Sequence, residues 1–304
     1  MGTPIIETTN LSFGYDANIT VLNRIGLRVE SATIYGFVGP NGAGKTTFIR
    51  LLLGLLPNRT GQISIFGKSI NHSRIDILSR LGCLVEQPSL YENLTGRENL
   101  VITSMIRGLK KSRIPVVLQL VDLTDAGGQY VSAYSLGMKQ RLGLAIALLG
   151  EPELLILDEP ANGLDPTGII EMRELLIRLN KEYGTTIFLS SHLLSELEKL
   201  VTHIGILRKG EMVFQGSMTQ LEALQHGQTV VVIDTNDNQA CFLLLKNDYP
   251  TIILKANRLQ FPYMSKSEIG IVCNRIVSAG FSLYEAKTVH HTLEDVFIKL
   301  TNNQ

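Results

Sequence analysis

Residues 39–46 read Gly39-Pro-Asn-Gly-Ala-Gly-Lys45-Thr46, directly after the apolar run Thr33–Val38 and before a helical pattern that continues to about Leu53. A strand, a glycine-rich loop and a helix in this order form the phosphate-binding motif GxxxxGK[ST]. The glycines let several backbone N–H groups point inward at an anion, and the N-terminus of the helix faces the same anion. The sequence therefore predicts an α/β fold with a phosphate site at this loop.

The residue types within the loop predict its individual contacts. Lys45 is expected to reach the β- and γ-phosphates of a nucleotide, and Thr46 to offer its hydroxyl to Mg²⁺. The alternative is a glycine-rich turn that matches the motif by chance, which the preceding strand and following helix disfavour. The residues predicted to bind the nucleotide here are Gly39, Pro40, Asn41, Gly42, Ala43, Gly44, Lys45, Thr46 and Thr47.

A pair of carboxylates follows a second apolar run about a hundred positions later. Leu154–Leu157 reads as a buried strand, and Asp158 and Glu159 come directly after it. Ligands of α/β folds bind at the carboxyl ends of strands. We therefore expect Asp158 to hold Mg²⁺, directly or through water, and Glu159 to polarise the attacking water. Such a pair is common at strand ends, and it indicates a nucleotide site here because a phosphate-binding loop precedes it in the chain.

Composition limits the classes of protein that fit. The chain has 304 residues, 44% of them hydrophobic, and Lys plus Arg equals Asp plus Glu at 28 each. Nucleic-acid binding normally shows as a basic excess, so we expect no nucleic-acid partner. The scattered cysteines Cys83, Cys241 and Cys273 form no CxxC pair and predict buried thiols. No run reaches the ~18 apolar residues of a membrane helix, so we expect no transmembrane segment in this chain.

The pattern along the chain predicts two domains. Apolar strands alternate with amphipathic helices to about residue 225, and residues 95–149 are helical in pattern behind a capping box at Thr95-Gly-Arg-Glu98. The polar stretch Gln225–Gln228 reads as a linker. After it, the order strand, helix, strand, strand, helix, strand, helix is typical of a small ferredoxin-like α+β domain. We expect a nucleotide-binding domain at 1–228, with a helical subdomain at about 90–150, and an accessory α+β domain at 229–304.

Over about residues 5–225 the chain resembles the ATPases of ABC transporters. The resemblance implies a RecA-like P-loop NTPase core with an antiparallel β flank and a helical subdomain. Tyr15 stands where the family has an aromatic residue that stacks on adenine, and Asn162-Gly-Leu-Asp165-Pro166 is similar to the loop that links the two sites of a dimer. His192 corresponds to the histidine near the γ-phosphate. The alternatives for Tyr15 and His192 are an ordinary core or surface tyrosine and a structural or solvated histidine.

The segment that gives the family its signature departs from the usual LSGGQ. Here it reads Tyr134-Ser135-Leu136-Gly137-Met138. Ser135 and Gly137 are retained, and a hydroxyl with close backbone approach at a helix N-terminus suits the γ-phosphate held by a second copy of the chain. The alternative is an ordinary capped helix that starts at Ser135 and faces the core.

A second departure concerns the loop that usually carries a glutamine. Counted from Leu81–Val85, the family glutamine falls on Glu86, with Gln87 as the other candidate. We therefore expect Glu86 to sense the γ-phosphate and Mg²⁺. A solvated pair at a strand end is the alternative for both residues.

Three segments are similar to the corresponding segments of bacitracin and lantibiotic-immunity exporters, namely Tyr134–Arg141, Glu86–Thr95 and Thr292–Phe297. The resemblance implies an ATPase subunit with ATP and Mg²⁺ as cofactors, which exports a peptide antibiotic. It implies a membrane-spanning permease on a separate chain, a homodimer of ATPase subunits, and a peripheral location at the cytoplasmic face of the membrane. The alternatives are an exporter of other cargo and a soluble or regulatory ABC ATPase.

Overall fold

The computed structural model describes residues 4–16, 19–58, 60–86, 88–226, 230–289 and 292–302. The chain forms two compact units, unit 1 (Met1–Met218) and unit 2 (Thr219–Gln304). Helix α8 (Met218–His226) runs across this division, so residues 225 and 226 of the predicted linker are helical. The expected domain boundary at 228/229 lies just beyond α8 and stays a prediction.

The central sheet of unit 1 is formed by the apolar runs of the sequence. Its spatial order is β10 (Glu211–Ser217), β9 (His203–Arg208), β3 (Ile34–Val38), β8 (Thr186–Ser191), β7 (Leu154–Asp158) and β6 (Leu81–Leu84). All neighbours in it are parallel except β10, which runs antiparallel to β9. Strands β3, β7 and β8 are buried along their whole length, as in a sheet covered on both faces.

A second, antiparallel sheet flanks this core. Its order is β2 (Leu22–Val29), β1 (Ile6–Phe13), β4 (Gln62–Ile65) and β5 (Lys68–Ser69). Strands β4 and β5 pair antiparallel across the turn at Phe66 and Gly67.

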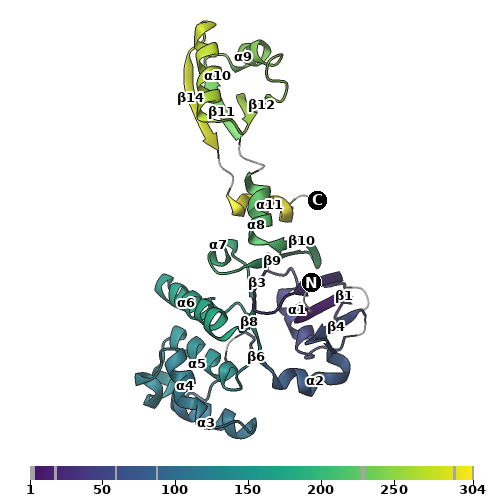
Figure 1. Ribbon diagram of the computed structural model, residues 1–304, viewed down its shortest axis with the longest axis vertical. Coiled ribbons are helices and arrows are strands. Elements are labelled where there is room, and N and C mark those ends of the chain that lie inside the picture. Colours follow the sequence, from purple (N-terminus) through teal and green to yellow (C-terminus); the bar gives the residue numbers. More distant parts are fainter. Residues whose placement is uncertain are drawn as a thin grey trace. The chain divides into compact units, whose positions relative to one another are not determined.

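Helices of unit 1 fall into two groups (Figure 1). Those beside the sheets are α1 (Lys45–Leu52), α2 (Ile70–Ser79), α6 (Pro166–Tyr183) and α7 (Leu194–Leu197). Those of the helical segment are α3 (Gly96–Ile106), α4 (Arg113–Leu120) and α5 (Leu136–Leu148). Helix α3 starts at the predicted capping box, where Glu98 N donates to Thr95 Oγ1 at 3.2 Å and Thr95 N donates to Glu98 Oε2 at 2.7 Å. Helix α5 packs against β6 and ties this segment to the central sheet.

From β11 onward, unit 2 has the element order that the sequence predicts. Its members are β11 (Val230–Thr235), α9 (Asn238–Leu245), β12 (Ile253–Lys255), β13 (Arg258–Pro262), α10 (Lys266–Ser278), β14 (Leu283–Val289) and α11 (Leu293–Asn302). The sheet order β12-β13-β11-β14, with antiparallel neighbours throughout, is that of a ferredoxin-like domain. A separate core that includes Ile233, Phe261 and Val272 packs within this unit.

Among the described residues, no helix is both long and apolar enough to cross a membrane.

An aromatic cluster fills the core of unit 1 beneath the glycine-rich loop. The Phe188 ring lies 5.6 Å from Tyr35, 5.5 Å from Phe37 and 6.1 Å from Phe48, measured between ring centroids. Phe188 comes from β8, Tyr35 and Phe37 from β3, and Phe48 from α1. The cluster therefore joins the strands and the helix that carry the loop.

We expect Phe188→Ala to lower the free energy of unfolding by about 3–5 kcal/mol, because it leaves a cavity between two central strands and α1. Urea unfolding of the full-length protein measures this loss. Tyr183→Ala, at an exposed residue of α6, is the control and should change stability little. A Phe188→Ala loss as small as that of the control would contradict the role given to the cluster.

Candidate active site

The glycine-rich loop and two distant segments of the chain line one cavity of about 430 Å³. The loop leaves β3 at Val38 and enters α1 at Lys45. Glu159 reaches the cavity from the end of β7, and His192 from the end of β8. The lining residues are Val21, Asn41, Gly42, Gly44, Lys45, Thr46, Thr47, Glu159, Asn162 and His192. The structure therefore brings together the loop, the catalytic carboxylate candidate and the histidine candidate.

Two glycines of the loop are required by the geometry around them. Gly44 has φ 108°, and a Cβ there would lie 2.8 Å from Leu22 Cδ2. A Cβ on Gly39 would lie 2.4 Å from the carbonyl oxygen of Leu207, which belongs to the neighbouring strand β9. A larger residue at either position would displace the loop from the strands that support it.

Lys45 is the first residue of α1 and its side chain is almost fully buried. Its Nζ donates to the carbonyl oxygen of Gly39 at 2.8 Å and approaches that of Pro40 at 3.5 Å. It also forms an ion pair with Glu159 Oε1 at 3.2 Å. The ammonium group is thus held between the loop and the acidic pair, which is where the phosphates of a nucleotide are expected.

Hydrogen bonds to Ser190 position both members of the acidic pair. Asp158 is 3% exposed, and its Oδ1 accepts a hydrogen bond from Ser190 Oγ at 2.6 Å. The same Oγ accepts from the backbone N–H of Glu159 at 2.9 Å. Asp158 and Ser190 are partners in the parallel pairing of β7 and β8. Ser190 is therefore a positioning residue that sequence reasoning missed, because only the register of the sheet shows it facing Asp158.

Glu159 and His192 contact each other directly. His192 Nδ1 lies 2.7 Å from Glu159 Oε2, so the carboxylate bridges Lys45 and His192 through its two oxygens. Glu159 has φ 50°, in the left-handed region that is uncommon for residues other than glycine. Strained backbone of this kind is concentrated at functional sites, where the surrounding structure holds it.

A smaller cavity of about 220 Å³ is lined by both members of the acidic pair. The residues that line it are Thr46, Glu86, Leu136, Gln140, Asp158, Glu159 and Asn162. All three predicted metal ligands, Thr46, Asp158 and Glu86, are in this set. Asn162 lines both cavities and is a second residue that the sequence analysis did not assign individually, although its motif marks the segment.

Glu86 follows β6 and forms an ion pair with Arg50 of α1. Its φ is 58°, so this loop also turns through the left-handed region. Burial lowers the pKa of Arg50, but the charge of Glu86 and the hydrogen bonds that the guanidinium donates to Tyr15 and Glu86 outweigh burial and raise the pKa overall. Gln87, the other candidate for this position, lies outside the described residues.

Tyr15 lies beside the first turn of α1. Its hydroxyl is 3.3 Å from Thr47 Oγ1, and its ring packs edge-on against Phe13 at 5.1 Å between centroids. The side chain is 56% exposed. Tyr15 is therefore largely exposed next to the loop, and its stacking on adenine stays a prediction.

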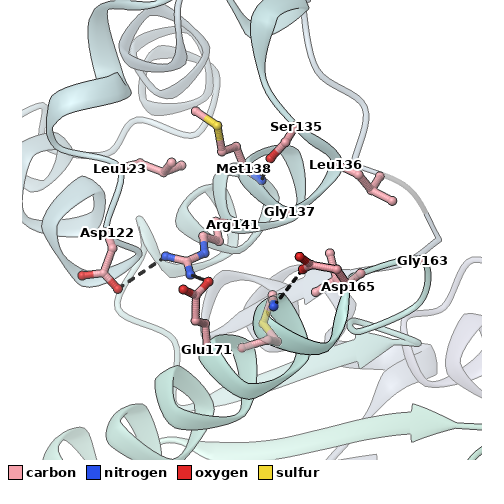
Figure 2. Close-up of a pocket in the computed structure, with 13 residues that line it drawn as sticks. Asp122, Leu123, Ser135, Leu136, Gly137, Met138, Arg141, Gly163, Asp165 and Glu171 are labelled. Carbon is pink, nitrogen blue, oxygen red and sulfur yellow. Dashed lines mark hydrogen bonds and ion pairs between the residues drawn. The ribbon is translucent and has the colours of Figure 1, made fainter.

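The signature segment lines a cavity that does not include Lys45. Ser135 is the N-cap of α5 and accepts a hydrogen bond from Met138 N at 3.3 Å, and Asp165 caps α6 by accepting from Gly168 N at 2.9 Å. Figure 2 shows both caps at one cavity, with Arg141 between Asp122 and Glu171. This cavity of about 380 Å³ contains Ser135, Gly137 and Asp165 but neither Lys45 nor Glu159. Within one chain, the structure does not bring Ser135 and Gly137 to the glycine-rich loop, although Leu136 between them lines a cavity with Thr46.

A buried lysine on a glycine-rich loop, a carboxylate pair and a histidine at the carboxyl edge of a parallel sheet define a P-loop nucleotide-binding protein. The sequence profile of the ABC transporter family matches residues 22–162. The bacitracin transport ATP-binding protein BcrA of Bacillus licheniformis is 41% identical over 299 residues, which span 97% of this chain and 97% of that protein.

Two further comparisons agree with this one. The lantibiotic transport ATP-binding protein SrtF of Streptococcus pyogenes is 39% identical over 221 residues, 73% of this chain and 94% of that protein. Among solved structures, cbiO1 from Clostridium perfringens, part of the ABC transporter complex cbiONQ, has a TM-score of 0.68 at 25% identity. That match covers 73% of this chain and 92% of cbiO1.

The chain belongs to the family of ATP-binding proteins of ABC transporters. The expected fold class is confirmed, including the antiparallel flank and the helical segment. The chain is accordingly an ATP-binding subunit whose ATPase activity is coupled to transport.

We expect Lys45→Ala to lose most of the ATP affinity and to lower turnover by on the order of a hundredfold or more, because a fixed positive charge on the transferred phosphoryl group disappears. Nucleotide binding and phosphate release by the purified protein measure the two effects. Lys68→Ala removes a lysine that pairs with Asp76 at the surface, and it should retain both properties. Near-normal ATPase activity of Lys45→Ala would overturn the site.

Proposed function

We propose that this chain hydrolyses Mg²⁺–ATP to drive export of a peptide antibiotic such as bacitracin or a lantibiotic. The observation that carries the catalytic part is the contact series Lys45–Glu159–His192 beside the glycine-rich loop. The cargo part rests on the relatives named for bacitracin and lantibiotic transport. No group in the described residues is assigned to the cargo.

The proposed hydrolysis uses the two oxygens of Glu159 in different ways. Lys45 pairs with Oε1, and phosphate oxygens of ATP would compete for the same ammonium group. Oε1 would then be available to accept a hydrogen bond from the attacking water, while His192 keeps Oε2 in place. Lys45 and the loop amides stabilise the charge on the phosphoryl group as it is transferred to water. ADP is the leaving group of this step.

The donor set beside the acidic pair fits a Mg²⁺ ion that arrives with the nucleotide. Among the described residues, no three His, Cys, Asp or Glu side chains form a metal cluster. Mg²⁺ at nucleotide sites takes one or two carboxylates and completes its shell with phosphates and water. Thr46, Asp158 and Glu86 supply a hydroxyl and two carboxylates around the 220 Å³ cavity. When bound, the ion would neutralise charge on the phosphates.

We also propose that two copies of the chain complete each other's sites. Ser135 and Gly137 start α5, so its free backbone N–H groups and helix dipole can face an anion. These residues line a cavity without Lys45. A nucleotide held by the loop of one copy would therefore meet Ser135, Gly137 and Asp165 only from a second copy. The two copies would act on a separate permease, at the cytoplasmic face of the membrane.

Residues 229–304 are proposed to be an accessory domain that nucleotide binding does not need. Every residue assigned to the site lies in unit 1. The lantibiotic transport relative matches over 221 residues, 94% of its length, which leaves little room in it for a second unit of the size found here.

We expect Glu159→Gln to bind Mg²⁺–ATP but to hydrolyse it on the order of a hundredfold more slowly, because the base that polarises water is lost while phosphate contacts remain. The trapped nucleotide should give an ATP-dependent dimer in size exclusion. Glu153→Gln changes a carboxylate that pairs with Arg80 at the surface, and it serves as the control. Wild-type turnover in Glu159→Gln would remove Glu159 from the catalytic role.

The cargo is tested in cells that lack this chain. We expect them to become several-fold more sensitive to bacitracin or to a lantibiotic, but not to an antibiotic with an intracellular target. The wild-type chain and Glu153→Gln should restore protection, and Glu159→Gln should not. Unchanged sensitivity to both peptides, with a co-purifying membrane protein, would indicate an exporter of other cargo. Absence of any membrane partner would indicate a soluble or regulatory ATPase.

A further inference from the structure

Gln140 is a buried glutamine on the face of α5 that meets the central sheet. It lies one turn after Leu136 and one turn before Gly143, so all three share that face. A Cβ on Gly143 would lie 2.7 Å from Pro88 Cβ and 3.0 Å from Leu84 Cδ1, which shows how closely α5 approaches the end of β6. Gln140 itself is 3% exposed.

The amide of Gln140 has unused hydrogen-bonding capacity in this position. Its Oε1 is buried and has no hydrogen-bond partner within the described part of the chain. A glutamine amide offers two donors and an acceptor with two lone pairs, and leaving such a group unpaired in the interior costs free energy. An apolar residue of similar size would fill the same space without that cost. The amide is therefore expected to serve a ligand.

The cavity that Gln140 lines indicates which ligand this is. Its other lining residues include the carboxylates of Glu86, Asp158 and Glu159 and the hydroxyl of Thr46. Lysine and arginine are missing from the lining, although Lys45 and Arg50 pair with Glu159 and Glu86. Because Glu159 and Glu86 are paired with these cations, the carboxylate of Asp158 and the hydroxyl of Thr46 are the groups that favour a cation in this cavity of about 220 Å³. The space admits several waters at roughly 30 Å³ each. Mg²⁺ keeps several of its waters when it binds to proteins.

We propose that Gln140 is a positioning residue for the hydrated Mg²⁺ of its own chain, whose amide hydrogen-bonds the water shell of the ion. This assignment rests on the proposed Mg²⁺–ATP function and adds to it a residue outside the phosphate-binding loop and the acidic pair. The amide is neutral, so it orders metal-bound water without adding charge to a site that already has three carboxylates. It acts on the metal complex of the nucleotide and not on metal-free ATP.

The test uses full-length protein with Gln140→Leu, which removes the amide and nearly conserves volume, and Gln140→Met as a second variant. Gln119→Leu, at an exposed residue of α4, is the matched control. ATP affinity is measured in EDTA, and Mg²⁺ is then titrated at saturating ATP by the thermal shift of the protein. Binding of Mn²⁺, followed by the loss of the free-ion signal in electron paramagnetic resonance, gives a second metal readout.

We expect Gln140→Leu to weaken metal affinity about tenfold, as other residues that act on a metal through its ligands do. Affinity for ATP in EDTA should stay unchanged, and the melting temperature without ligand should stay unchanged or rise, because an unpaired buried amide is removed. Gln119→Leu should match wild type in all three. Gln140→Met should behave as Gln140→Leu, which keeps the test valid if one variant folds poorly.

Two results would overturn the inference. One is a metal midpoint in both variants equal to that of wild type. The other is a lowered melting temperature without ligand in both variants, together with weaker ATP binding in EDTA, which would make Gln140 a structural residue of α5. If wild type itself shows no Mg²⁺-dependent ATP binding, the proposed function fails first, and this inference fails with it.

Discussion

The ion pair between Lys45 and Glu159 depends on the alignment of three neighbouring parallel strands. Val38 pairs with Ser191 across β3 and β8, and Ser190 pairs with Asp158 across β8 and β7. The carboxyl ends of the strands therefore lie level, and the segments that follow them meet at one edge. A buried ammonium group without a partner would be costly, so Lys45 requires both the loop carbonyls and Glu159 to be in place.

The buried polar side chains of unit 1 show how the site is supported. Five buried polar side chains lie at this edge of the sheet, namely Lys45, Thr47, Asp158, Ser190 and Ser191. The aromatic cluster around Phe188 lies in the same strands, just before their polar ends. An apolar core thus fixes the strand ends, and the strand ends hold charged groups in an arrangement that an isolated segment could not maintain.

Leu136 shows how a departure from the family motif is accommodated. It replaces a glycine of the usual signature, and a Cβ on Gly163 would lie only 2.9 Å from its Cδ2. Gly163 has φ 77°, so this position already favours glycine. The larger side chain therefore lies against the loop that follows the acidic pair, and it lines the cavity that contains Thr46 and Asp158. The substitution fills space between α5 and that loop while Ser135 still caps the helix.

The parts of the protein that could be predicted from residue order are those that follow local rules. The glycine-rich loop, the strand before it and the helix after it could be predicted because backbone freedom at glycine and the spacing to Lys45 are properties of one short segment. The element order after residue 229 was likewise sufficient to predict the ferredoxin-like sheet, because short connections and antiparallel pairing allow few arrangements of the strands. The linker at 225–228 was misjudged at its start, since the polar residues 225 and 226 continue a helix anchored by buried Met218 and Leu221.

Contacts between side chains from distant segments follow from how the strands and helices pack together. Ser190 contacts Asp158 because of strand register, and Gln140 faces the acidic pair because α5 packs on β6. Arg50 of α1 reaches Glu86, which follows β6, across a separation of 36 positions in the sequence. The separation of Ser135 from Lys45 is also a tertiary result, since the two lie in different cavities. Residue types and spacings along the chain specify local backbone, whereas these contacts depend on how whole strands and helices pack, which no single segment encodes.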